Sequence, residues 1–229
     1  MKIVMKKYPK SPIIIEGFPG YGLVGTIATE FLIDHLKCDL IGEFLYDELP
    51  ATVAIHKGKL VRPMAIYYAA KPNIVILHTI LNTKGFEWKI ADNVIALAKK
   101  VTAKELISLE GVGSMSEEQD TKLYSYGNDQ FVKLGAEPVQ ESIIMGVTSA
   151  IMLRYDKISC LFAGTHSSLP DSKAAAKIIE MLDKYLGLKV DYQPLIKQAQ
   201  VFESKLKTIM ASSSKAQDDA ERKQMSYLG

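Results

Sequence analysis

The spacing of hydrophobic positions changes several times along the chain, and each kind of spacing predicts a kind of element. Short runs of β-branched and apolar residues bounded by glycine or proline are typical of buried strands. Such runs predict strands at 12–16, 40–46, 65–69, 74–78, 105–110 and 158–164. Apolar residues that recur every three or four positions predict helices. Such stripes predict helices at 23–36, 87–101, 146–154, 171–186 and 195–209, with a shorter one at 128–134.

Turn residues and helix caps arrange these elements into a fold class. Lys57-Gly58 and Lys71-Pro72-Asn73 stand at hairpin spacing and predict an antiparallel meander between Thr52 and Thr79. Asp171 follows Pro170 and is a good N-cap for the helix after it. Strands and helices alternate on both sides of the hairpin insert. The pattern therefore predicts an α/β fold whose mixed β-sheet is sandwiched by helices.

The chain is long enough for one large domain, and its composition changes once near the end. Its 229 residues are 48% hydrophobic, which is ordinary for a globular protein. After Met210 the sequence becomes polar and serine-rich, with no apolar stripe. We therefore expect a single α/β domain at 1–210 and a polar, flexible C-terminal tail at 211–229.

Charge and cysteine content exclude several classes of protein. The 28 Lys and Arg residues nearly balance the 26 Asp and Glu residues, so no basic field favours nucleic acid as a partner. Two cysteines, Cys38 and Cys160, are too few for a disulfide framework or a structural zinc site. The longest apolar runs are strand-sized, and no signal-peptide pattern follows the N-terminal lysines. We therefore expect no membrane segment and a cytoplasmic protein.

A glycine-rich loop after the first predicted strand offers one candidate site. Gly20-Tyr-Gly22-Leu-Val-Gly25 has the G-x-G-x-x-G spacing that lets backbone N–H groups approach a pyrophosphate. However, Gly17-Phe18-Pro19 separates this motif from its strand, and Pro19 supplies no N–H. The loop is therefore interpreted as a structural tight turn or a protein-contact loop, with nucleotide binding as the alternative.

Acidic and histidine residues near the predicted strand ends offer a second candidate site. In open α/β sheets ligands bind outside the carboxyl ends of the strands, and His/Glu pairs can do acid–base work. Four such residues occur here: Glu16, His78, Glu110 and His166. Whether they converge depends on strand order, which the sequence does not give. They define an alternative function as a small-molecule enzyme.

Other catalytic and metal-binding patterns are missing from the sequence. No Gly-Lys-Ser/Thr occurs, and Ser114 has Val112 where the G-x-S-x-G nucleophile elbow needs a glycine. The four histidines have neither the i, i+4 spacing nor the cysteine partners of a metal site. We expect no cofactor and no bound metal.

Several short motifs together resemble the proteasome assembly chaperone family, which archaea, bacteria and eukaryotes share. The loop residues Gly17, Phe18, Pro19, Gly20, Tyr21, Gly22 and Gly25, before an apolar helix, are similar to its N-terminal signature. Further similarities follow in the same order along the chain, at Leu109–Val112, Gly146–Ala150 and Pro170–Ala175. The resemblance covers residues 11–200 and is closest to archaeal and bacterial homologues of the second eukaryotic chaperone.

The resemblance implies a phosphorylase/hydrolase-like α/β sandwich without established catalytic residues. It also implies a homo-oligomeric, non-enzymatic chaperone or adaptor that binds proteasome α subunits or the core particle. Some relatives dock between α subunits through a C-terminal hydrophobic–Tyr–any tripeptide. This chain ends differently, with tyrosine third from the end, so its candidate docking residues are Met225, Tyr227, Leu228 and Gly229.

Overall fold

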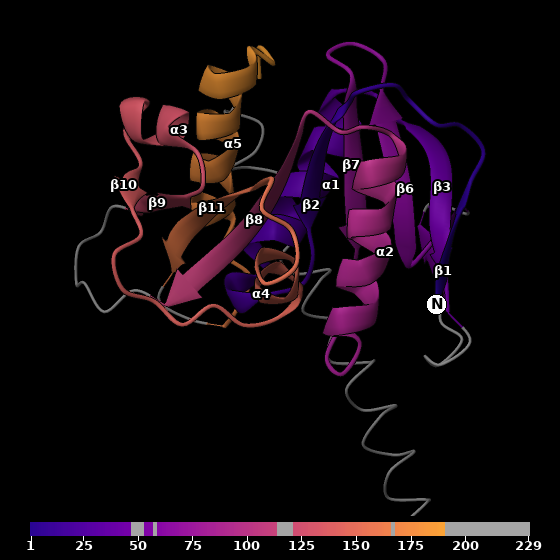
Figure 1. Ribbon diagram of the computed structural model, residues 1–229, viewed down its shortest axis with the longest axis horizontal. Coiled ribbons are helices and arrows are strands. Elements are labelled where there is room, and N and C mark those ends of the chain that lie inside the picture. Colours follow the sequence, from indigo (N-terminus) through magenta and orange to yellow (C-terminus); the bar gives the residue numbers. More distant parts are fainter. Residues whose placement is uncertain (47–52, 57–58, 114–120, 166–167, 191–229) are drawn as a thin grey trace, which may run out of the picture.

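Nine strands form one mixed β-sheet with helices on both faces (Figure 1). The computed structural model describes residues 1–46, 53–56, 59–113, 121–165 and 168–190. The order of the strands is β1-β3-β6-β7-β2-β8-β11-β9-β10. Their bounds are β1 (Lys2–Met5), β2 (Ile13–Gly17), β3 (Asp39–Leu45), β6 (Met64–Ala69), β7 (Ile74–Thr79), β8 (Glu105–Gly113), β9 (Leu123–Tyr126), β10 (Glu137–Pro138) and β11 (Ile158–Thr165). The predicted mixed-sheet α/β class is confirmed.

The centre of the sheet is parallel, while most pairs toward its edges are antiparallel. β2 pairs in parallel with β7 and with β8, and β8 pairs in parallel with β11. Parallel strands are covered on both faces and read as continuous apolar runs rather than as alternating patterns. This explains why the runs at 13–15 and 74–77 are hydrophobic at every position.

Helices divide the interior into two cores, one on each face of the sheet. One face carries α1 (Val24–His35), α3 (Asp129–Lys133) and α5 (Ser172–Leu186). The other carries α2 (Glu87–Lys100) and α4 (Val147–Met152), and Figure 1 shows α2 crossing in front of the sheet. A short 3-10 turn, η1 (Tyr21–Leu23), precedes α1. Side chains on the two faces of the same strand therefore have different neighbours.

The helix predictions are confirmed where the structure describes them. All six apolar positions of the predicted stripe in α2 are buried: Ile90, Ala91, Val94, Ile95, Leu97 and Ala98. The carboxylate of Asp171 accepts a hydrogen bond of 2.9 Å from the backbone N–H of Ala174, as an N-cap does. The predicted helix 195–209 and the tail 211–229 lie outside the described residues and stay predictions.

Two strand predictions need correction. β8 does not end at Glu110 but continues to Gly113, because β11 pairs with it up to Thr165. Within the predicted meander, β6 and β7 form an antiparallel pair of the main sheet, and β6 also pairs with β3, which precedes the meander. The strands β4 (Ala54–His56) and β5 (Lys59–Val61) instead pair with each other in a separate two-stranded sheet. Of the helices in the described part of the chain, none is both long and apolar enough to cross a membrane.

Candidate functional site

A cavity of about 400 Å³ lies where β2 and β8 end at the carboxyl edge of the parallel strands. This is the edge at which open α/β sheets bind ligands, and the volume is within the range of small-molecule pockets. Three segments line it, namely the loop 18–21 after β2, the end of β8 at 110–113, and residues 142–148. We call the last of these the rim segment.

Two carboxyl groups approach each other beside this cavity. Glu16 on β2 pairs in register with Ser108 on β8, and Glu110 follows Ser108 by two residues. Because side chains alternate along a strand, all three project from the same face of the sheet. The Ser108 hydroxyl donates a hydrogen bond of 2.5 Å to Oε1 of Glu16, which is buried. Glu110 lines the cavity itself.

A helix supplies the group that joins the two carboxyls. Thr148, in the first turn of α4, donates a hydrogen bond of 2.6 Å from Oγ1 to Oε2 of Glu110. The same oxygen lies 2.8 Å from Oγ of Ser108. The result is a continuous series of contacts that we call the carboxyl–hydroxyl relay. It comprises, in order, Glu16, Ser108, Thr148 and Glu110.

Burial makes both carboxyl groups of the relay weak acids. Desolvation raises the pKa of Glu16 to about 7, although hydrogen bonds from Ser108, Phe18 and Thr148 oppose the rise. Desolvation likewise raises the pKa of Glu110 to about 8 against its bond from Thr148, and the charge of Glu16 adds to the rise. A carboxyl that changes protonation near neutral pH can exchange a proton with a ligand.

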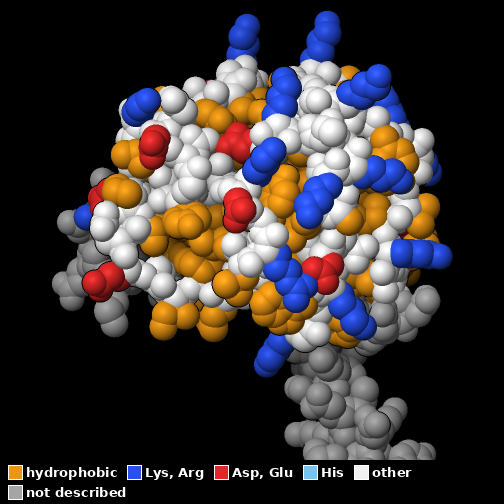
Figure 2. Space-filling view, in the orientation of Figure 1, with side chains coloured by type: hydrophobic (Ala, Val, Ile, Leu, Met, Phe, Trp, Pro, Cys, Tyr) orange, Lys and Arg blue, Asp and Glu red, His pale blue; other side chains and the backbone are white. Residues whose placement is uncertain are grey.

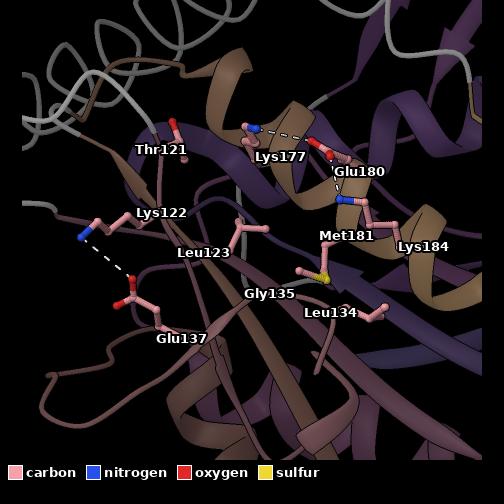
Figure 3. Close-up of a pocket in the computed structure, with 10 residues that line it drawn as sticks. All are labelled: Thr121, Lys122, Leu123, Leu134, Gly135, Glu137, Lys177, Glu180, Met181 and Lys184. Carbon is pink, nitrogen blue, oxygen red and sulfur yellow. Dashed lines mark hydrogen bonds and ion pairs between the residues drawn. The ribbon is translucent and has the colours of Figure 1, made fainter. Parts of the chain in front are cut away.

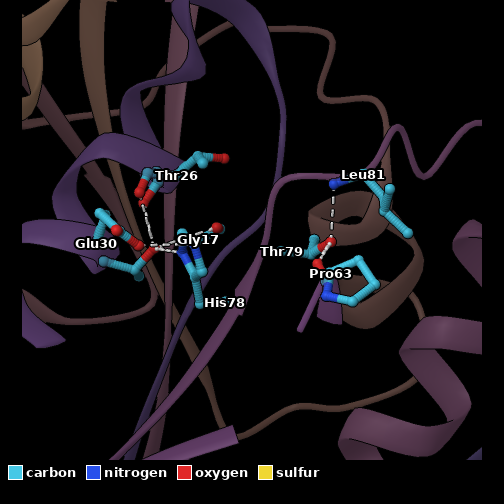
Figure 4. Close-up of polar contacts among 9 residues, drawn as sticks. Gly17, Thr26, Glu30, Pro63, His78, Thr79 and Leu81 are labelled. Carbon is cyan, nitrogen blue, oxygen red and sulfur yellow. Dashed lines mark hydrogen bonds and ion pairs between the residues drawn. The ribbon is translucent and has the colours of Figure 1, made fainter. Parts of the chain in front are cut away.

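The sequence left open whether the four strand-end residues converge, and His78 does not join the two glutamates. On β7 it pairs in register with Gly17, one step beyond Glu16, so it projects from the opposite face of the sheet. Its Nδ1 lies 2.9 Å from Oγ1 of Thr29, and its Nε2 lies 3.0 Å from Oε2 of Glu30 (Figure 4). Only the two glutamates converge, and His166 lies outside the described residues.

The glycine-rich loop brings backbones into contact. A methyl group added at Gly17 would lie 2.2 Å from the carbonyl oxygen of Gly25, and one added at Gly25 would lie 2.2 Å from that of Leu109. Gly22 has a φ of +65°, which glycine adopts without strain. The approaches that the motif allows are thus made by protein backbone, and the carboxyl of Glu110 lies against Gly20. An acid at this place disfavours a phosphate group, so the geometry favours the structural-turn interpretation.

Ser108 and Thr148 are the site residues that sequence reasoning missed. Neither belongs to a local chemical motif, and Thr148 lies on a helix, 40 residues after Ser108 in the sequence. Ser108 and Glu110 are two residues apart and therefore lie on the same face of their strand. Only the register with β2 brings Glu16 beside them.

A second, smaller hollow of about 220 Å³ lies beside α5 and β9 (Figure 3). Its charged side chains pair with one another. Glu180 is 2.8 Å from Nζ of Lys184 and 3.5 Å from Nζ of Lys177, and Lys122 is 3.9 Å from Glu137. It therefore makes a weaker candidate for a ligand site. In the described part of the chain, no group of three or more His, Cys, Asp or Glu residues is placed to hold a metal ion.

Large hydrophobic side chains are exposed at the mouth of the 400 Å³ cavity. Ile143 and Met145 of the rim segment are 88% and 75% exposed, and Tyr21 across the cavity is 41% exposed. Figure 2 shows hydrophobic side chains at the surface of the face that carries α2, between Lys and Arg side chains. Apolar groups this exposed mark candidate protein contacts.

Comparisons with known proteins match nearly the whole chain. A model of the PAC2 family matches residues 14–210. PbaA of Pyrococcus furiosus, described as an archaeal homolog of proteasome-assembly chaperone, is 30% identical with a TM-score of 0.83, over 94% of this chain and 99% of PbaA. Uncharacterized protein MJ0106 of Methanocaldococcus jannaschii is 27% identical over 96% of this chain and 94% of its own length. PbaB of Pyrococcus furiosus, described as an archaeal proteasome activator, is 22% identical and shares the fold with a TM-score of 0.74, over 91% of this chain and 98% of PbaB.

Proposed function

The chain belongs to the PAC2 family, and we propose that it is a non-enzymatic proteasome assembly chaperone or proteasome-binding adaptor. The observation that carries the proposal is the likeness to PbaA, which extends over 94% of this chain and 99% of PbaA at 30% identity. Similarity over the whole domain, rather than over one motif, supports a shared kind of action.

The partners in this proposal are proteasome α subunits or the core particle, together with further copies of the same chain. Assembly factors act through surfaces, and stable interfaces need apolar side chains at their centre. Ile143 and Met145 supply such side chains on a loop, where each exposes most of its surface to solvent. The proposal places the protein in the cytoplasm, where proteasome subunits assemble.

Binding to the proteasome is tested with an immobilised core particle from the source organism. The full chain should be retained, and the double variant Ile143→Asp, Met145→Asp should bind at least tenfold more weakly. Leu60→Asp is the matched control, because Leu60 is 63% exposed on the separate β4–β5 sheet. If the core particle does not retain the full chain, or if both variants bind equally well, the proposal fails in this form.

The oligomer and the C-terminal tail have tests of their own. Sedimentation at micromolar concentration should give a particle several times heavier than the 25.4 kDa chain, and a 25.4 kDa particle would contradict self-association.

Deleting 226–229 should leave the oligomer intact and weaken core-particle binding at least tenfold if the tail docks. Tyr227→Ala should reproduce most of that loss, because an aromatic anchor carries much of a groove contact. Unchanged binding would assign recognition to the folded body.

A further inference from the structure

We propose that the 400 Å³ cavity binds an organic cation, an ammonium or guanidinium group on a short apolar body. Glu110 is its counter-ion, and Glu16 takes up the proton that Glu110 gives up. This inference goes beyond the proposed function, because assembly through surface contacts requires no ligand cavity.

The lining of the cavity combines apolar walls with one carboxyl group. Phe18, Tyr21, Val112, Ile144 and Val147 contribute hydrophobic surface. Glu110 is the one carboxylic acid among the described lining residues, and these residues include no Lys, Arg or His. Aromatic rings favour cations over their faces, and apolar walls favour an alkyl body. The described lining therefore complements a cation with a hydrophobic stem.

One oxygen of Glu110 is available to such a ligand. The hydroxyl of Thr148 is hydrogen-bonded to Oε2 of Glu110. Within the described residues, no hydrogen bond to Oε1 is formed, and this oxygen lies against Gly20, which also lines the cavity. A carboxylate oxygen without a donor in a largely buried place gains most from an N–H donor that is also charged. An ammonium or guanidinium group supplies both.

Counting hydrogens in the relay shows how Glu110 can ionise without a second buried charge. The relay has three contacts between four groups, and the hydroxyls of Ser108 and Thr148 contribute one hydrogen each. Three hydrogen bonds in a row need three hydrogens, so one carboxyl supplies the third. The complete relay thus holds one acid proton and one negative charge. The proton can reside on either glutamate. When it is on Glu110, Glu110 donates to Thr148, Thr148 to Ser108 and Ser108 to Glu16. When it is on Glu16, all three hydrogen bonds run in the opposite direction.

A bound cation selects one of these two arrangements. The proton on Oε2 of Glu110 passes to Thr148, the Thr148 hydrogen passes to Ser108, and the Ser108 hydrogen passes to Oε1 of Glu16. Glu110 becomes a carboxylate that faces the cation, and Glu16 becomes a neutral acid in the interior. No proton enters or leaves the protein in this step, and no desolvated charge is left without a partner.

Among the described residues, two titratable groups other than the carboxyls themselves face Glu16 and Glu110. Cys160 on β11 lies near both, and burial together with the charges of Glu16 and Glu110 raises the pKa of its thiol. Tyr21 stands on the cavity wall. Neither carries a positive charge, so neither replaces the cation.

Calorimetric titration of the full chain at pH 7.5 tests the proposal. The probes are n-butylammonium and n-butylguanidinium, with butan-1-ol as the neutral control of the same stem. Both cations should bind at least tenfold more tightly than the alcohol, because the alcohol brings no charge to Glu110. Equal binding of cation and alcohol, or no binding of either cation, would overturn the proposal.

Variants assign the binding to the relay. Glu110→Gln keeps the shape of the side chain and should weaken n-butylammonium binding at least tenfold. Glu141→Gln is the matched control, because Glu141 is exposed beside the rim segment but does not line the cavity, and it should change affinity less than twofold. If the two variants behave alike, Glu110 is not the counter-ion. Thr148→Val provides a second variant that breaks the relay, and it should also weaken binding.

Spectroscopy separates ligand binding from a structural role. With ¹³C-labelled glutamate side chains, n-butylammonium should move the Glu110 carboxyl resonance toward the carboxylate position and the Glu16 resonance toward the acid position. If neither resonance shifts, the proton transfer is contradicted.

The source of the cation is distinguished with Nα-acetyl-lysine N-methylamide. Binding at least tenfold tighter than that of n-butylammonium assigns the cavity to a lysine side chain of a partner, and equal binding assigns it to a free amine.

Discussion

At the ends of β2 and β7, the two faces of the sheet each bury an ionisable side chain, but they surround it differently. On the α1 face, His78 contacts Thr29 and Glu30 of a single helix. On the α2/α4 face, Glu16 contacts hydroxyls from a strand and a helix, and the series continues to Glu110 at a cavity. Each face thus buries an ionisable group among hydroxyls.

The difference between the faces lies in what closes the site. α1 begins in direct backbone contact with β2 and β8 through Gly17 and Gly25, which leaves His78 enclosed by protein. On the other face the start of the short helix α4 and the rim segment line an open cavity together with the strand ends. A buried ionisable side chain therefore contributes to packing on one face and can contribute to ligand binding on the other. The following predictions test this contrast.

The largest effect is expected from adding a methyl group at the close backbone contact between α1 and β8. A methyl group at Gly25 would lie 2.2 Å from the carbonyl oxygen of Leu109, and the backbone of β8 would have to move. We expect Gly25→Ala to lower the free energy of unfolding by about 3 kcal/mol or more, despite the better helix propensity of alanine. Urea denaturation measures this.

Gly20→Ala is the counterpart on the other face. Its added methyl group meets the end of the flexible Glu110 side chain, which can swing aside, and the backbone of Gly20 is already extended. We expect a loss of only about 1 kcal/mol. Equal losses in the two variants would show that the faces are packed alike.

The next effect is a dependence of stability on pH that originates in the relay. The folded-state pKa values of about 7 for Glu16 and about 8 for Glu110 lie above the ordinary value of 4.5. Between these limits the unfolded chain has released protons that the folded protein keeps, so the free energy of unfolding falls as pH rises from about 4.5 to 8. The part of this fall in the free energy of unfolding that is due to Glu16 is on the order of 3 kcal/mol.

Glu16→Gln should remove this part of the slope, as measured by urea denaturation at pH 5, 6.5 and 8. Relative to the parent protein, the variant should gain stability at pH 8 and not at pH 5. Glu141→Gln should leave the slope as it is, because Glu141 is exposed. A flat pH profile in the parent protein would mean that the two carboxyls are not buried as weak acids.

Removing the bridging hydroxyl on each face gives a smaller, matched pair of effects. Thr148→Val takes a donor from Glu110 and should cost about 2 kcal/mol at pH 8 and less at pH 6, since the bond favours the ionised carboxylate. Thr29→Val takes a partner from the buried Nδ1 of His78 and should cost about 1 kcal/mol. Thermal unfolding of both variants at both pH values checks this. A Thr148→Val loss that does not grow with pH would separate Thr148 from the ionisation of Glu110.

The smallest effect is expected for the contact between His78 and Glu30 on the α1 face. Glu30 is 41% exposed, so water screens its attraction to His78. Glu30→Gln should therefore change the free energy of unfolding by less than about 1 kcal/mol. A loss as large as that of Thr148→Val would show that the α1 face also depends on a buried charge.

The sequence by itself determined the elements and the class of the fold, because these follow from local patterns. The stripe in α2 predicts its buried face residue by residue, and the N-cap at Asp171 fixes the start of α5. Consecutive apolar residues at 13–15 indicate a strand covered on both faces, and β2 is such a strand. The spacing of hydrophobic residues reports which side of an element is buried, and it needs no knowledge of the partner.

Only the tertiary structure decided which polar residues meet. Glu16 and His78 both stand near strand ends, yet one step of register sends them to opposite faces. Thr148 reaches Glu110 because α4 packs on the same face, and no local spacing encodes that contact. Strand order and register are set by the summed packing of distant segments. A site built from four residues on three elements is therefore determined by the fold as a whole.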